Sequence, residues 1–305
     1  MIGAPRHTVP HTALRVSAAA AHLTAALPPL LLAAERVAAL VQHGAHGRRR
    51  VGQGEAFWQF RRYQPGDDVS TIDWRSSARS QHYFVREREW EAVQTLLIWV
   101  DRTASMDWHS AKTLPTKLIR ALILALAVAR LALDAGEQVA LLQEPTRRYR
   151  GKQALQHLAL ALLQAPPTPY PPAVALPRHA SLLIVSDFLN PIAPWDDLCA
   201  AWADRGCHGQ FLQVLDPAER DPPWQGRILL EGREQEPSLL ASRFENWIAP
   251  YRQRLAAQQD ALHSIARAAG WSVTLHSTET PPQLCVNHLY QLFDAPTGTG
   301  QRQRT

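Results

Sequence analysis

The chain has 305 residues, of which 46% are hydrophobic and 19% charged, so it is long enough for one large domain with an appendage and apolar enough to build a core. Its net charge is +5, and almost all of its positively charged residues are arginines. The arginines are scattered rather than gathered in a basic tail, which argues against specific nucleic-acid binding. The three cysteines lack paired spacing, which is typical of a reducing compartment.

For residues 1–47 we predict a loose arm followed by a helical segment. An uncharged stretch over 16–34 superficially resembles a signal peptide or a short membrane span, but it is rich in alanine and interrupted by Pro28 and Pro29. The apolar pattern then continues at helical spacing. We therefore predict a helical hairpin that turns at the two prolines, no membrane span, and a cytoplasmic protein.

Residues 48–92 predict a small β-rich appendage. Short aromatic and β-branched runs over 56–60 and 82–85 are separated by turn signals, which is the pattern of paired short strands.

A Pro-Gly-Asp-Asp turn in this appendage carries Asp67 and Asp68, with arginines such as Arg79 close by in the sequence. Two interpretations stay open. Either the aspartates pair with the arginines and hold the appendage on the α/β domain, or these charged side chains form a recognition surface for a partner. Trp74 favours the first, since a tryptophan here indicates a packed environment.

We predict an α/β domain over residues 93–295 and a disordered tail over 296–305. Apolar runs over 95–100 and 181–186 are typical of strands buried on both faces, and an apolar helix over 117–134 follows the first. The alternation predicts a mainly parallel, doubly wound sheet with right-handed crossovers. Further strands are expected over 138–143, 209–215 and 271–276, helices over 152–164, 195–205 and 242–269, and an accessory hairpin over 225–236.

Oxygen-bearing side chains follow two of these strands. Asp101 comes directly after the first strand, Thr103 and Ser105 follow at alternate positions, and Asp187 ends the later strand. In such sheets ligands bind beyond the carboxyl ends of the strands, so we expect the four side chains to converge. Carboxylates and hydroxyls suit a hard divalent cation such as Mg²⁺.

The loop of Asp101, Thr103 and Ser105 with a distant strand-end aspartate resembles the metal-ion-dependent adhesion site of von Willebrand factor A domains. The segments upstream are RYQPGDD at 62–68, IDW at 72–74, SAR at 77–79 and VRE at 85–87. Together they resemble the signature of the bacterial family called domain of unknown function 58, whose members carry a divergent A-type domain. The resemblance runs from about residue 52 to 276. It implies a von Willebrand factor A-like fold and a MoxR-type AAA+ ATPase as partner, with other proteins of the same gene cluster as further candidates.

The third loop departs from the adhesion-site pattern. Where a threonine ligand is expected, residues 149–153 offer Lys152 and no hydroxyl at that position. Three alternatives stay open: the four side chains hold a divalent cation, the ammonium of Lys152 takes the place of that cation, or the aspartates merely cap loops and helices.

Sequence signatures of catalysis are missing from this chain. It has no P-loop, no HExxH and no nucleophile elbow, and Thr103 stands where a haloacid-dehalogenase phosphatase has its second aspartate. We therefore expect a non-enzymatic interaction module whose aspartate face docks an acidic residue of the partner, with Trp108 at the rim. The alternative is a metal-dependent phosphoester hydrolase using Asp101 and Asp187.

Overall fold

The computed structural model describes residues 11–45, 58–63, 72, 74–78, 82–88, 95–233 and 237–294. Contacts divide the chain into two compact units, Met1–Gly44 with Gln94–Thr305, and Ala45–Val93. The tail over 296–305, predicted to be disordered, lies outside the described residues.

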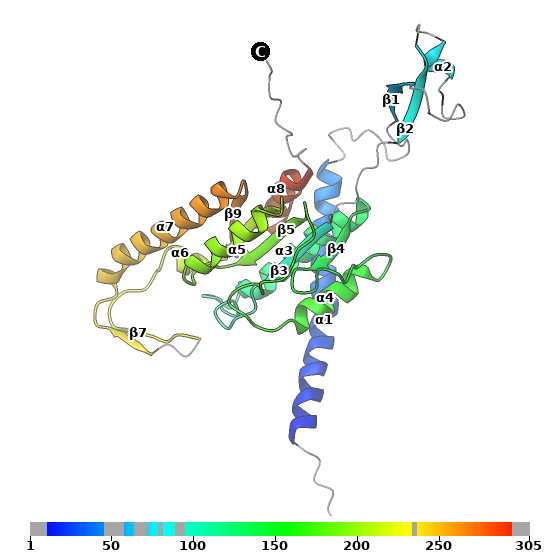
Figure 1. The fold of residues 1–305 in the computed structure, drawn as a ribbon. Coiled ribbons are helices and arrows are strands. Elements are labelled where there is room, and N and C mark those ends of the chain that lie inside the picture. The colour runs from blue at the N-terminus through cyan, green and yellow to red at the C-terminus, as the bar shows by residue number, and fades with distance from the viewer. Residues whose placement is uncertain are drawn as a thin grey trace, which may run out of the picture. The chain divides into compact units, whose positions relative to one another are not determined.

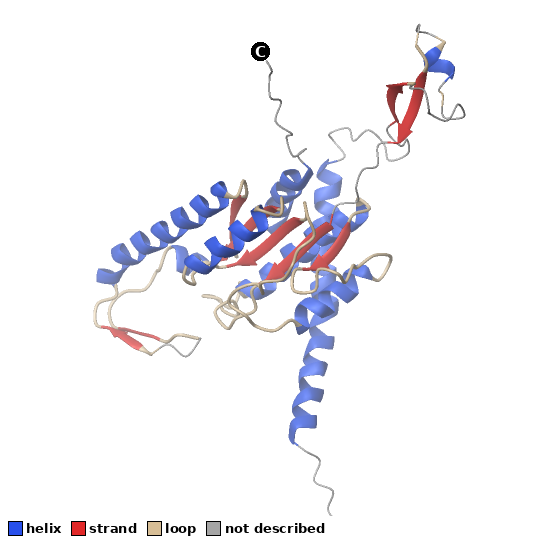
Figure 2. Ribbon diagram, viewed as in Figure 1, coloured by secondary structure: helices blue, strands red, loops and turns tan. Residues whose placement is uncertain are grey.

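The larger unit is built on a five-stranded sheet in which every neighbouring pair is parallel (Figures 1 and 2). Its order is β4-β3-β5-β6-β9, so the winding reverses between β3 and β5. This confirms the mainly parallel α/β sheet. Its strands are β3 (Thr95–Val100), β4 (Gln138–Leu141), β5 (Ser181–Ser186), β6 (His208–Leu215) and β9 (Ser272–Ser277).

Two hydrophobic cores lie on the two faces of this sheet. Along β3, Leu96, Ile98 and Val100 join one core, whereas Leu97 and Trp99 join the other. Alternate residues of a strand point to opposite faces, and both faces are covered, which explains why the whole run is apolar.

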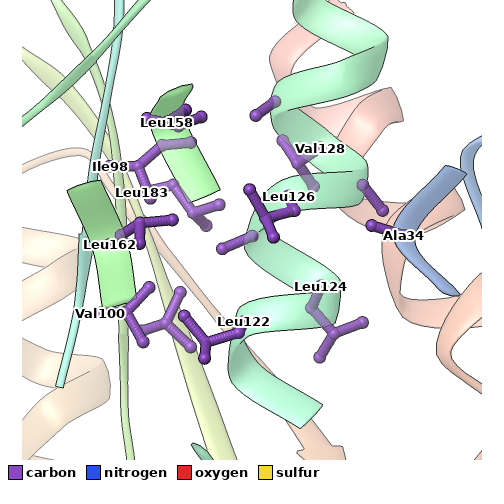
Figure 3. Close-up of a cluster of buried hydrophobic side chains, with 14 of the residues drawn as sticks. Ala34, Ile98, Val100, Leu122, Leu124, Leu126, Val128, Leu158, Leu162 and Leu183 are labelled. Atoms are coloured by element: carbon purple, nitrogen blue, oxygen red, sulfur yellow. The ribbon is translucent and has the colours of Figure 1, made fainter. Parts of the chain in front are cut away.

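Helices cover both cores. Figure 3 shows Leu122 of α3 beside Val100 of β3 in the first core. The first core also receives α4 and α8, and the second receives α5 and α7. The helices are α3 (Lys117–Asp134), α4 (Ala154–Gln164), α5 (Ala193–Ala203), α7 (Glu245–Ala268) and α8 (Pro282–Asp294).

The predicted helical hairpin at the N-terminus is wrong. The chain forms one helix, α1 (His11–Ala45), that continues through Pro28 and Pro29. After the prolines its apolar face, including Leu30 and Ala34, packs into the first core, and this tertiary packing outweighs the local helix-breaking effect. The stretch Ala25–Gln42 is long and apolar enough to cross a membrane, and 28% of it is buried in the structure.

The smaller unit contains an antiparallel pair, β1 (Trp58–Arg62) with β2 (Phe84–Arg88), and a short helix α2 (Trp74–Ser77). These strands lie within the segment for which the sequence predicts β structure. Trp74, expected in a packed environment, is 60% exposed, and its ring meets Tyr83 edge-on.

Three elements near the carboxyl end of the sheet complete the larger unit. The short helix α6 (Pro217–Arg220) follows β6, and the hairpin predicted over 225–236 is a longer arm formed by β7 (Ile228–Leu230) and β8 (Leu239–Ala241). Figure 1 shows this arm in yellow, between α6 and the start of α7.

Candidate functional site

The predicted oxygen cluster forms at the end of β3. Asp101 is fully buried, and its Oδ1 accepts hydrogen bonds from the backbone N–H (2.8 Å) and the hydroxyl (2.7 Å) of Thr103. The Thr103 hydroxyl lies 3.0 Å from that of Ser105. The other carboxylate oxygen, Oδ2, accepts from Ser186 at 2.7 Å, at the end of the neighbouring strand β5. The register of the two strands, Val100 opposite Val185, brings these loops together.

Asp187 directly follows β5, beside this cluster. Its Oδ1 accepts from the backbone N–H of Leu189 at 3.1 Å, while its Oδ2 lies 2.8 Å from the ammonium nitrogen of Lys117. Phe188, which lies between Asp187 and Leu189 in the chain, has a backbone φ of 52°, a left-handed conformation that is rare outside glycine. The turn sends the Phe188 ring into the second core, while the Asp187 carboxylate meets the ammonium.

Lys117 is the site residue that sequence reasoning missed. It is the first residue of α3, it is fully buried, and its Nζ also lies 2.5 Å from Glu219 Oε1. Burial alone lowers the pKa of this ammonium, but the charges of Asp187 and Glu219 outweigh burial, so its pKa lies above the usual value. A signal was present in the sequence, because the helix after the first strand begins at the carboxyl edge and starts with a lysine.

Glu219 reaches the cluster from α6, which is held in place by a capping box. Asp216 caps the helix by accepting from Ala218, and its backbone N–H donates to Glu219 Oε2 at 3.0 Å. Burial raises the pKa of Glu219, and the charge of Lys117 offsets part of that rise. Asp216 also accepts from the backbone N–H of Ser110, which ties α6 to the Asp101 loop.

The ammonium in the site is therefore that of Lys117, and the assignment to Lys152 is corrected. Lys152 is exposed in the turn before α4, and no ion pair joins it to the described carboxylates of the site. The sequence indicated Lys152 because this residue lies in the loop that supplies the third ligand of an adhesion-type site. The ammonium instead belongs to the first residue of the helix after the first strand.

The four predicted ligands do not fit a divalent cation as they are arranged. Each carboxylate oxygen of Asp101 and Asp187 already accepts from a hydroxyl, a backbone N–H or the Lys117 ammonium. Mg²⁺ and Ca²⁺ require about six oxygen ligands, and an ammonium stands beside the carboxylates. Among the described residues, no group of three or more His, Cys, Asp or Glu side chains is arranged to hold a metal. The same contacts leave the hydrolase alternative without a supporting observation.

An aromatic groove of about 570 Å³ borders this cluster. Ser105 and Glu219 contribute to its lining, so the groove and the charge cluster share residues. The predicted rim residue Trp108 also lines it, half-buried, with its ring 6.5 Å from that of Trp224. Trp247, at the start of α7, is 46% exposed there.

The β7–β8 arm forms one wall of the groove. Leu229, a lining residue on β7, is 54% exposed, and Arg233 donates to the backbone carbonyl of Asp107 in the Asp101 loop. The other proposed partner-binding residues, Asp67, Asp68 and Arg79, lie outside the described residues.

The buried carboxyl of Asp101 predicts a pH-dependent stability. Burial raises its pKa to about 6 against the hydrogen bonds from Thr103 and Ser186, and the charge of Asp187 raises it further. The folded state binds this proton more tightly than the unfolded state, so the stabilisation is complete below about pH 4 and is lost as the pH rises through 6. His276 changes the pH dependence of stability in the opposite direction. Burial lowers its pKa to about 4, so the folded state binds this proton less tightly than the unfolded state does. The wild type should therefore lose about 2 kcal/mol relative to Asp101→Asn between pH 4.5 and 7.5.

Denaturant unfolding of both proteins at the two pH values measures this difference. Asp197→Asn, which changes an exposed carboxyl on α5, is the control and should show the pH dependence of the wild type. An equal gap between wild type and Asp101→Asn at both pH values would show that Asp101 is not held as described.

These features define a class of protein: a parallel α/β protein with a buried charge cluster and an aromatic groove at the carboxyl edge of its sheet. The family described as "Protein of unknown function DUF58" matches residues 59–261, and the chain belongs to this family.

Curated relatives and solved structures also match parts of the chain. The uncharacterized protein Rv1480 of Mycobacterium tuberculosis (strain ATCC 25618 / H37Rv) is 29% identical over 249 residues, covering 76% of this chain and 77% of its own length. The uncharacterized protein YeaD of Bacillus subtilis (strain 168) is 29% identical over 102 residues, covering 33% and 25%. The conserved hypothetical protein BatB of Bacteroides thetaiotaomicron matches with TM-score 0.35 and 14% identity, over 66% of this chain and 98% of its own. An uncharacterized membrane spanning protein of Vibrio fischeri matches with TM-score 0.20 and 11% identity, over 67% and 98%.

Proposed function

We propose that this protein is a non-enzymatic interaction module with a von Willebrand factor A-like α/β unit, and that its partner is a MoxR-type AAA+ ATPase. The fold supports the choice of site, because β3 and β5 meet where the strand order reverses, and ligands of open α/β sheets bind there. The resemblance to A-type domains and their ATPase partners supplies the class of partner.

The aromatic groove carries this proposal. Trp224, Leu229 and Trp247 are between 37% and 54% exposed, although a large apolar side chain in water is unfavourable. Contiguous apolar patches beside a polar rim mark protein-interaction sites, and tryptophan is enriched among the residues that dominate binding energy.

The charge behind the groove selects the chemistry of the partner segment. The ammonium of Lys117 faces two carboxylates, those of Asp187 and Glu219, and the buried carboxyl of Asp101 is close enough to Asp187 to feel its charge. An acidic partner residue, as an adhesion-type site would take through its cation, meets an excess of negative charge here. The occupant we propose is therefore a segment with an apolar anchor for the groove next to a basic residue.

Truncating the groove should weaken ATPase binding without unfolding the protein. We expect Trp247→Ala and Leu229→Ala to raise the Kd for a purified MoxR-type AAA+ ATPase of the same organism by roughly 10-fold or more, because central apolar contacts dominate such interfaces. Biolayer interferometry measures the affinity, and thermal unfolding should show a melting temperature close to that of the wild type.

The matched control is Leu40→Ala. Leu40 is 58% exposed on α1, and its neighbour Gln42 hydrogen-bonds Asp134 at the far end of α3 from Lys117. Equal losses for Leu40→Ala and Leu229→Ala would remove the groove from the interface. A wild type that does not bind the ATPase would refute the proposed partner.

The proposal places the groove in the cytoplasm, where the ATPase obtains ATP. Cys199, Cys207 and Cys285 are free and buried, as expected in a reducing compartment. Fractionation of cells that express a tagged chain tests this, with the soluble fraction as the expected result and a carbonate-resistant membrane fraction as the contrary one.

A further inference from the structure

The position of Lys117 resembles that of a bound cation. Its ammonium lies between a carboxylate at the end of β5 and a carboxylate on α6, at 2.8 and 2.5 Å. The adjoining loop of Asp101, Thr103 and Ser105 has the residues of an adhesion-type metal loop, yet its oxygens are engaged in hydrogen bonds to one another and to Ser186.

Burial makes this contact more than a surface ion pair. The side chains of Lys117 and Asp187 are each 1% exposed, so water contributes little to the solvation of either charge. Removing one member of such a group leaves an uncompensated buried charge, which is strongly destabilising. Because the ammonium is part of the chain, its presence does not depend on any ion in solution.

We propose that Lys117 is a built-in counter-ion that replaces the divalent cation of an adhesion-type site, so that the site assembles without metal and accepts one only when this side chain is removed. The ammonium joins α3, the end of β5 and α6, and α6 in turn lines the aromatic groove through Ala218 and Glu219. The cation thus holds one wall of the groove in place.

The first test uses the wild-type chain. Isothermal titration calorimetry with Mg²⁺ and Mn²⁺ should show no stoichiometric binding, and neither ion nor EDTA should shift the melting temperature by more than about 1 °C. Binding of one Mg²⁺ or Mn²⁺ per chain, with a rise in melting temperature, would overturn the proposal.

The second test removes the ammonium while keeping the length of the side chain. Lys117→Met should lower the melting temperature by roughly 6–15 °C in EDTA, as expected for a broken buried ion pair in a protein of this size. Saturating Mn²⁺ should restore about 5–10 °C, because carboxylates and hydroxyls are ligands for this ion. Lys152→Met, at an exposed lysine, is the control and should behave as the wild type.

A second variant keeps the test decisive if Lys117→Met does not fold. Lys117→Met with Glu219→Gln removes one buried carboxylate together with the ammonium, and should fold and respond to Mn²⁺ through Asp101 and Asp187. A Lys117→Met protein with unchanged stability, or a folded variant without a response to Mn²⁺, would contradict the proposal.

Discussion

Asp187→Ala should lower the free energy of unfolding by about 2–4 kcal/mol, because the buried ammonium of Lys117 loses one of its two charge-assisted hydrogen bonds and keeps Glu219 as its ion-pair partner among the described residues. The substitution also removes the acceptor of the Leu189 backbone N–H. Guanidinium unfolding monitored by tryptophan fluorescence measures the loss.

Asp197→Ala is the matched control, since it deletes an exposed carboxylate on α5 and should change stability by less than about 0.5 kcal/mol. A double-mutant cycle with Lys117→Met isolates the pair, and we expect its coupling free energy to exceed about 2 kcal/mol. A loss below 1 kcal/mol for Asp187→Ala would mean that the ammonium does not depend on this carboxylate.

Trp195→Ala should destabilise the protein by a similar amount, about 3–5 kcal/mol. Its fully buried ring lies at the centre of the second core, with its centroid 4.9 Å from that of Phe188 and 5.8 Å from that of Trp99. The cavity left by the indole ring cannot collapse without moving strand side chains on both sides.

Trp247→Ala provides the comparison for this second prediction, because it removes the same side chain from a half-exposed position and should cost less than about 1 kcal/mol. Urea unfolding of both variants separates them. Similar losses for the two tryptophans would contradict the core position of Trp195. Comparing Trp195→Ala with Trp247→Ala therefore distinguishes a tryptophan that stabilises the core from one that lines the groove.

The sheet and its main helices could be predicted from the sequence because their signals are local. The runs over 95–100, 117–134 and 181–186 have the same bounds in the structure as in the prediction, since apolar side chains fill each element and polar residues end it. The convergence of Asp101 and Asp187 followed from the rule that parallel strands end at one edge.

The parts that could not be predicted depend on contacts between distant residues. The sequence places a lysine at the start of the helix after the first strand, but Lys117 lies 70 residues from Asp187 and 102 residues from Glu219, and no local pattern indicates these partners. The helix α6 is only four residues long, too short for a periodic pattern. At Pro28 and Pro29 the local rule predicted a break, but packing of the apolar face on the core kept the helix continuous.

Hydrogen–deuterium exchange of the protein with and without the MoxR-type ATPase tests most directly whether the carboxyl edge of the sheet is the docking surface. We expect the ATPase to slow amide exchange in the loop after β3, in the β7–β8 arm and at the start of α7, where the groove residues lie. Slowed exchange confined to residues 45–93, with none at this edge, would contradict docking at the groove and assign recognition to the Pro-Gly-Asp-Asp segment instead.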